Sequence, residues 1–71
     1  MEEVKIREIA ELVRDVARCV TNDQDALLLI FRLRFIGVPF TKEIKEVLLQ
    51  EFNKNFEVPS WLLDFVLDIK E

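Results

Sequence analysis

The sequence predicts an all-α fold, a compact four-helix domain with a central apolar second helix. Apolar residues recur at three- and four-residue steps along most of the chain, which is the period of a helix that buries one side. The 71 residues include one glycine and two prolines, so few positions interrupt a helix. Hydrophobic residues make up 51% and charged residues 34%, a composition typical of a helical protein with a large core. A single domain over residues 1–71 is expected at this length.

The first helix is predicted over residues 3–20. Its apolar side chains repeat along one face, formed by Ile6, Ile9, Ala10, Val13, Val16, Ala17 and Val20. Leu12 and Cys19 flank this face and widen it to about half of the helix circumference. Glu3 near the start and Arg18 near the end complement the helix dipole. Cys19 is expected to be buried as a small hydrophobic side chain.

The second helix is predicted over residues 23–36, with Asn22 as its N-cap. Gly37, which can adopt a positive φ, and Pro39 after it predict a sharp end. At about 100° per residue, the apolar side chains between Ala26 and Ile36 point in every direction around this helix. A helix that is hydrophobic all round must be covered all round.

The third helix is predicted over residues 42–54, with Thr41 as its N-cap. One face is apolar, formed by Ile44, Val47, Leu48 and Phe52. Asn55 is expected to end the helix in the left-handed conformation that asparagine tolerates.

The fourth helix is predicted over residues 61–69, with Ser60 as its N-cap. Leu63 and Leu67 lie outside its core-facing side, so its apolar arc covers roughly two-thirds of a turn. The terminal helix of a small monomer should have a wider polar face than this helix has. A protein interface is therefore predicted on the fourth and second helices, at Leu28, Phe31, Leu63 and Leu67.

Self-association is the expected source of additional stability. A chain of this size buries only about 60% of its unfolded surface. A single cysteine excludes an intramolecular disulfide, and the absence of histidine excludes a zinc site of the usual nitrogen and sulfur ligands. The sequence therefore predicts a homo-oligomer, as a symmetric dimer, because two-fold pairing is the commonest arrangement. The surface around Leu12 and Cys19 is the alternative contact if the fourth helix is not used.

No residue pattern predicts catalysis, a cofactor or a metal site. The chain has no histidine to act as a base at neutral pH, and nothing supplies a base to Cys19. One glycine is too few for a phosphate-binding loop. Asp23 and Asp25 lack the glycine and the later glutamate of a calcium loop, so helix capping explains them better.

The charge balance bears on partners and location. The formal net charge of −4 opposes binding to nucleic acid and to anionic membranes. No stretch reaches the roughly 18 apolar residues that span a bilayer. The start, Met1-Glu2-Glu3, lacks the basic region of a signal peptide, so a cytoplasmic location is expected. Few His, Cys and Met residues and many Glu, Lys, Arg, Ile and Val residues would be typical of a thermophile.

The predicted function is a non-enzymatic protein-interaction or assembly module, with a second copy or another protein as its partner. The alternative is a small helix-turn-helix regulator, because residues 37–40 join the second and third helices in that outline. The third helix would then contact DNA through Lys42, Lys45, Gln50 and Asn53. Glu43, Glu46 and Glu51 share or border that surface and oppose such binding. A dimer that gathered basic residues on one face would favour this alternative.

Overall fold

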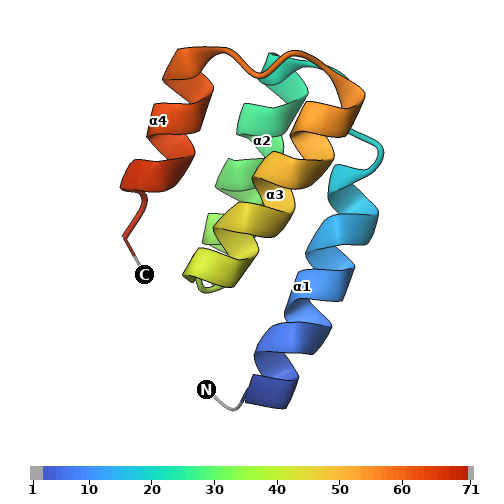
Figure 1. Cartoon of the computed structure of the whole chain (residues 1–71). Coiled ribbons are helices and arrows are strands. Elements are labelled where there is room, and N and C mark those ends of the chain that lie inside the picture. Colours follow the sequence, from blue (N-terminus) through green and yellow to red (C-terminus); the bar gives the residue numbers. More distant parts are fainter. Residues whose placement is uncertain (1–2, 71) are drawn as a thin grey trace.

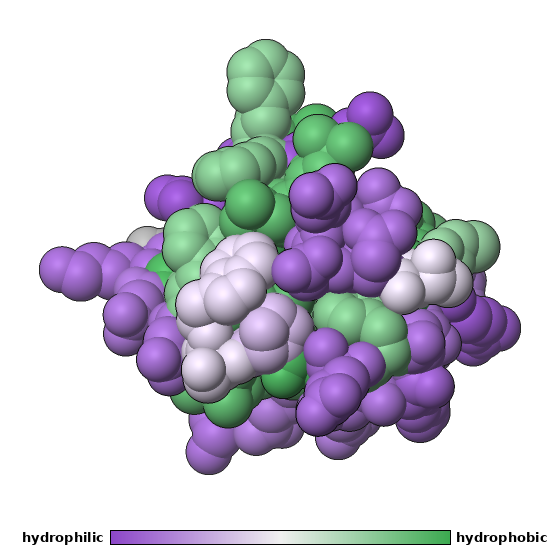
Figure 2. Space-filling view, turned by 90° about the horizontal axis from the view of Figure 1, so that it is seen from above, coloured by the Kyte–Doolittle hydropathy of each residue, from purple (hydrophilic) through white to green (hydrophobic). Residues whose placement is uncertain are grey.

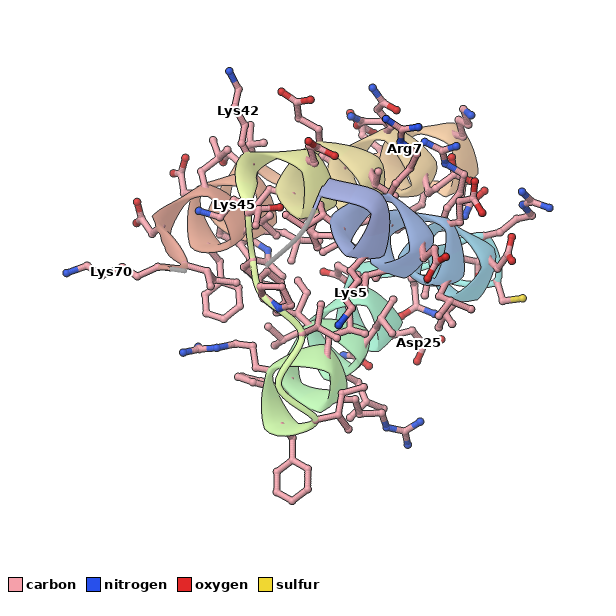
Figure 3. All side chains as sticks on the ribbon, turned by 90° about the horizontal axis from the view of Figure 1, so that it is seen from below. Lys5, Arg7, Asp25, Lys42, Lys45 and Lys70 are labelled. Atoms are coloured by element: carbon pink, nitrogen blue, oxygen red, sulfur yellow. The ribbon has the colours of Figure 1, made fainter. Side chains whose placement is uncertain are left out.

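The computed structural model describes residues 3–70, with side chains described for residues 5–70. Four helices follow one another along the chain: α1 (Glu3–Ala17), α2 (Asp23–Phe35), α3 (Lys42–Asn55) and α4 (Ser60–Asp68). They run alternately up and down, with α3 in front of α2 (Figure 1). Seen from below, α2 and α3 lie on opposite sides of the molecule, with α1 and α4 between them (Figure 3). The predicted all-α, four-helix class is confirmed. The prediction that the second helix is central was wrong, because α2 lies at the edge of the bundle and α1 and α3 make the most extensive helix contact (Figure 3).

The core lies between these four helices and includes the chain between α2 and α3. Helix α2 buries Ala26, Leu29, Ile30 and Leu33 on one side. Helices α1 and α3 make the most extensive contact of any two helices, and Ala17 of α1 is small and fully buried. The other buried apolar residues are Val13, Val20, Phe40, Ile44, Val47, Leu48, Phe52, Leu62, Val66 and Ile69.

Helix α1 ends at Ala17, three residues before its predicted end at residue 20. After Ala17 the chain tightens into a 3₁₀-type turn, in which the N–H of Cys19 donates to the carbonyl of Val16 at 3.2 Å. The side chain of Asn55, at the end of α3, supplies the reason. Its Nδ2 donates to the carbonyls of Ala17, Arg18 and Val20 at 3.1, 3.1 and 2.8 Å. These carbonyls are therefore satisfied by α3, and in the case of Ala17 also by the N–H of Val20 at 3.1 Å, instead of by a further helical turn.

The prediction that Asn55 ends α3 in the left-handed conformation was wrong. Within residues 3–70, a positive φ occurs at Gly37 and at no other residue. Asn55 is the last helical residue of α3, and Phe56 follows in extended conformation. Asn55 therefore does not end its own helix by a special backbone conformation. Its side chain caps the end of α1 instead.

The predicted caps of α2 are confirmed. Asn22 Oδ1 accepts from the N–H of Asp25 at 2.8 Å. At the other end Gly37 has a φ of 92°. The N–H groups of Gly37 and Val38 donate to the carbonyls of Arg34 and Leu33 at 3.1 and 2.9 Å, which is the Schellman arrangement. Helix α2 therefore ends at Phe35, one residue before its predicted end.

The starts of α3 and α4 differ in how they are capped. Thr41 Oγ1 accepts from the N–H of Ile44 at 3.3 Å, as predicted. Ser60 was predicted to be the N-cap of α4, which was wrong, because Ser60 is the first helical residue and Pro59 is the N-cap. The proline ring holds φ at −69°, which allows the chain to enter the helix directly after it. The carbonyl of Pro59 accepts from the N–H of Leu62 at 3.1 Å.

We expect Asn55→Ala to lower the free energy of unfolding by about 1–3 kcal/mol, because it removes the side-chain donor of the carbonyls of Ala17, Arg18 and Val20, of which Ala17 keeps only the N–H of Val20. Asn55→Asp should be more damaging, since a carboxylate would face those carbonyl oxygens. Asn53→Ala is the matched control, on the same helix but exposed, and should change stability by less than about 0.5 kcal/mol. Urea denaturation at one fixed protein concentration measures all three. Equal effects of the two alanine variants would contradict this role for Asn55.

Candidate functional site

The outer side of α2 carries an exposed apolar stripe. At about 100° per residue, Leu28, Phe31 and Phe35 lie on the side of the helix opposite its buried residues. Their exposed fractions are 48%, 51% and 92%. In the view from above, hydrophobic side chains project from the edge of the molecule formed by α2, at the top of Figure 2. We call these three residues the α2 stripe.

An apolar groove runs between α1 and α2, to one side of the α2 stripe. Its first hollow is lined by Ile9, Leu12, Val13, Val16, Leu33, Ile36 and Val38. Val16 also lines the second hollow, together with Cys19, Val20, Asp25, Leu28, Leu29 and Arg32. We call the two hollows together the α1–α2 groove. The surface around Leu12 and Cys19, predicted as an alternative contact, therefore adjoins the α2 stripe at Leu28.

The other side of the α2 stripe meets α4. The rings of Phe31 and Phe65 have centroids 6.0 Å apart and an interplanar angle of 70°. This edge-to-face arrangement is the one that aromatic pairs prefer. Trp61, one turn before Phe65, is also exposed. Helix α2 is thus a ridge with apolar side chains on its crest and on both of its flanks.

The four predicted interface residues are all exposed, and they form two separate pairs. Leu28 and Phe31 belong to the α2 stripe. Leu63 and Leu67 lie about 160° around α4 from Phe65, the residue that contacts Phe31. Nζ of Lys45 on α3 donates to the carbonyl of Leu67 at 3.1 Å. The leucine pair on α4 therefore lies on the edge of that helix away from α2.

Sequence reasoning missed two features of this surface. Phe35 is the most exposed large hydrophobic residue of the described chain, yet it was not among the predicted interface residues. Its spacing of seven residues from Leu28 was the available signal. Cys19 was expected to be buried, and it is exposed. The early end of α1 explains this, because Cys19 lies in a turn and not on a helix face.

Of the residues predicted to contact DNA, Lys42, Gln50 and Asn53 share the outer side of α3, and Lys45 lies at its edge toward α4. Lys42 and Asn53 are exposed on α3. Figure 3 shows Lys42 pointing away from the molecule and Lys45 pointing toward α4, where it donates to the carbonyl of Leu67. Gln50 lines a hollow between α1 and α3 that has both basic and acidic residues. The others lining it are Arg7, Ala10, Glu11, Arg14, Glu43, Glu46 and Val47.

Glu51 was predicted on or beside this outer surface, which was wrong. It is 4% exposed, and Nζ of Lys54 lies 3.2 Å from its Oε2. Helical periodicity places it near Ile44 and Val47, on the side of α3 that faces the core. This carboxylate therefore does not oppose a nucleic-acid partner directly, whereas Glu43 and Glu46 remain exposed.

Three further findings concern metal binding, membrane-spanning helices and similarity to known proteins. Within residues 3–70, no group of three or more His, Cys, Asp or Glu residues is placed to hold a metal ion. None of the helices described is long and apolar enough to cross a membrane. Comparison with models of protein families, with curated proteins and with solved structures finds no match to this chain.

We expect no non-specific binding to duplex DNA tighter than about 100 μM near physiological salt. The net charge is −4, and the exposed surface of α3 includes Glu43 and Glu46 beside its lysines. Fluorescence anisotropy with a labelled random duplex measures this. Micromolar binding that weakens steeply as salt is raised would support the helix-turn-helix alternative instead.

Proposed function

We propose that this chain is a non-enzymatic assembly module that forms a homodimer through the outer surface of α2. The observation that carries the proposal is the α2 stripe, three large apolar side chains aligned on the exposed side of one helix. Removing apolar surface from water stabilises a protein contact by about 25 cal/mol per Å² of buried area. Contiguous apolar patches of this kind mark protein contacts more often than single exposed residues do.

The amount of exposed surface supports the same proposal. The accessible surface of the chain is 4998 Å². A folded monomer of 8.4 kDa is expected to expose about 4,600 Å². The chain therefore exposes at least as much surface as is usual at this size, and the exposed large hydrophobic residues on α2 or beside it are Leu12, Val16, Leu28, Phe31, Phe35 and Ile36.

A second copy is the partner that the shape of this surface favours. A two-fold contact must be self-complementary, because the same patch serves on both subunits. The α2 stripe is a ridge, and the α1–α2 groove lies directly beside it. One copy therefore carries both halves of a ridge-into-groove contact. The expectation of a reducing, cytoplasmic setting, in which Cys19 stays a free thiol, remains a prediction from composition.

Sedimentation equilibrium tests the proposal directly. At micromolar concentration we expect a species of about twice 8.4 kDa, held by a contact that buries at least about 1,000 Å² in total. A single 8.4 kDa species across the micromolar range would overturn the homodimer.

Two double variants locate the contact. Leu28→Gln/Phe35→Gln should raise the dimer dissociation constant at least tenfold, because it removes apolar area from the α2 stripe, and helical circular dichroism should persist. Leu63→Gln/Leu67→Gln is the matched change on α4, and it tests the remaining prediction that those leucines take part. An equal loss of association would extend the contact to α4, whereas an unchanged mass would confine it to α2. Wild-type association by the α2 variant would exclude the α2 stripe.

A further inference from the structure

Charges at the two ends of α2 have opposite signs. Asp23 and Asp25 lie in its first turn, and Arg32 and Arg34 lie in its last turn. Asp25 and Arg32 both line the α1–α2 groove, together with Leu28. They are seven residues apart, which places them on the same side of the helix and about 10.5 Å apart along its axis. One flank of α2 therefore presents an acidic end, an apolar middle and a basic end.

Neither of these two charges is neutralised by an ion pair within the part of the chain that the structure describes. The ion pairs formed there join Arg18 to Asp15 and Lys54 to Glu51. The carboxylate of Asp25 accepts one hydrogen bond, from Nδ2 of Asn22 at 2.9 Å. Both charged groups are exposed and able to meet a partner.

The order of charges distinguishes the two ways in which α2 can pair with its copy. In a parallel two-fold pair, this flank of α2 meets the opposite flank of the partner's helix, so Asp25 and Arg32 find no oppositely charged neighbour there. In an antiparallel pair, Asp25 lies opposite the partner's Arg32, and symmetry forms the same contact twice. Antiparallel pairing also places helix dipoles of opposite direction side by side.

The charges also select the register of the antiparallel pair. A two-fold axis over the middle of the α2 stripe, between Phe31 and Arg32, would bring Arg32 close to the partner's Arg32. An axis over Leu28 places Asp25 opposite the partner's Arg32 and Leu28 against the partner's Leu28, and Phe35 then reaches past the start of the partner's α2 toward the turn that precedes it. Val16 and Cys19, which line the same groove, then flank the contact.

We infer that α2 pairs antiparallel with α2 of a second copy, with Leu28 at the two-fold axis and Asp25 facing Arg32 of the partner subunit. This inference rests on the proposed homodimer and adds its orientation, its register and the charges that select both. The occupant of the apolar surface is therefore the same surface of another copy of this chain.

Charge reversal in the full-length chain tests the pairing. Asp25→Arg and Arg32→Asp should each raise the dimer dissociation constant at least tenfold at low salt, because each places two like-charged pairs across the contact. An equimolar mixture of the two variants should restore association, since both arginines of one chain then face both aspartates of the other. High salt should reduce these differences, because the Debye length is only about 3 Å at 1 M.

Arg34→Asp is the matched control. It makes the same change of charge on the same helix, about 160° around the axis from Arg32, where it lines a hollow with Phe65 and Asp68. We expect Arg34→Asp to leave the dissociation constant unchanged. Circular dichroism of every variant shows whether the helices persist.

Cysteine cross-linking provides an independent measurement of orientation. In a Cys19→Ser background, chains carrying Asp25→Cys and chains carrying Arg32→Cys are oxidised, separately and mixed, because a disulfide cross-link joins only residues whose Cα atoms lie within about 7 Å. Antiparallel pairing predicts that cross-linked dimers form mainly in the mixture. Cross-linking of each variant with itself at the same yield would overturn the antiparallel pairing.

The outcomes separate this inference from the proposed function. A monomeric wild-type chain would overturn both. A wild-type dimer whose dissociation constant is unaffected by Asp25→Arg and by Arg32→Asp would overturn the antiparallel pairing and leave the homodimer in place.

Discussion

Helix α2 has apolar side chains on all sides, and three other short helices are available to cover it. The structure buries one side completely, at Ala26, Leu29, Ile30 and Leu33, and leaves the α2 stripe exposed. Because a single small core cannot surround a helix that lies at the edge of the bundle, the uncovered side is the feature around which the proposed assembly is built.

A polar constraint determines how α1 and α3 fit together. The last carbonyls of a helix need donors, and one side chain of α3 supplies them to α1. Asn55 thereby fixes the end of α1 and the start of the turn that contains Cys19. The exposure of Cys19, and hence its place in the α1–α2 groove, follows from three hydrogen bonds made by a residue 36 positions further along the chain.

The charges of α2 serve two levels of structure. Within the chain, aspartates at the start and arginines at the end complement the helix dipole. Across a two-fold axis, the same order favours antiparallel pairing, because only that arrangement brings opposite charges together. The same charged residues that stabilise the isolated helix would therefore also orient the dimer.

The sequence by itself determined the features that depend on neighbours a few residues away. These are the four helices, the caps at Asn22 and Thr41, and the stop at Gly37, because each is made by hydrogen bonds that span three to five residues. It also predicted that α2 would lack cover. Only the tertiary structure decided the role of Asn55, the exposure of Cys19, and the separation of Leu63 and Leu67 from the α2 stripe. Each of these depends on which helix lies beside which, and periodicity along one helix carries no information about that choice.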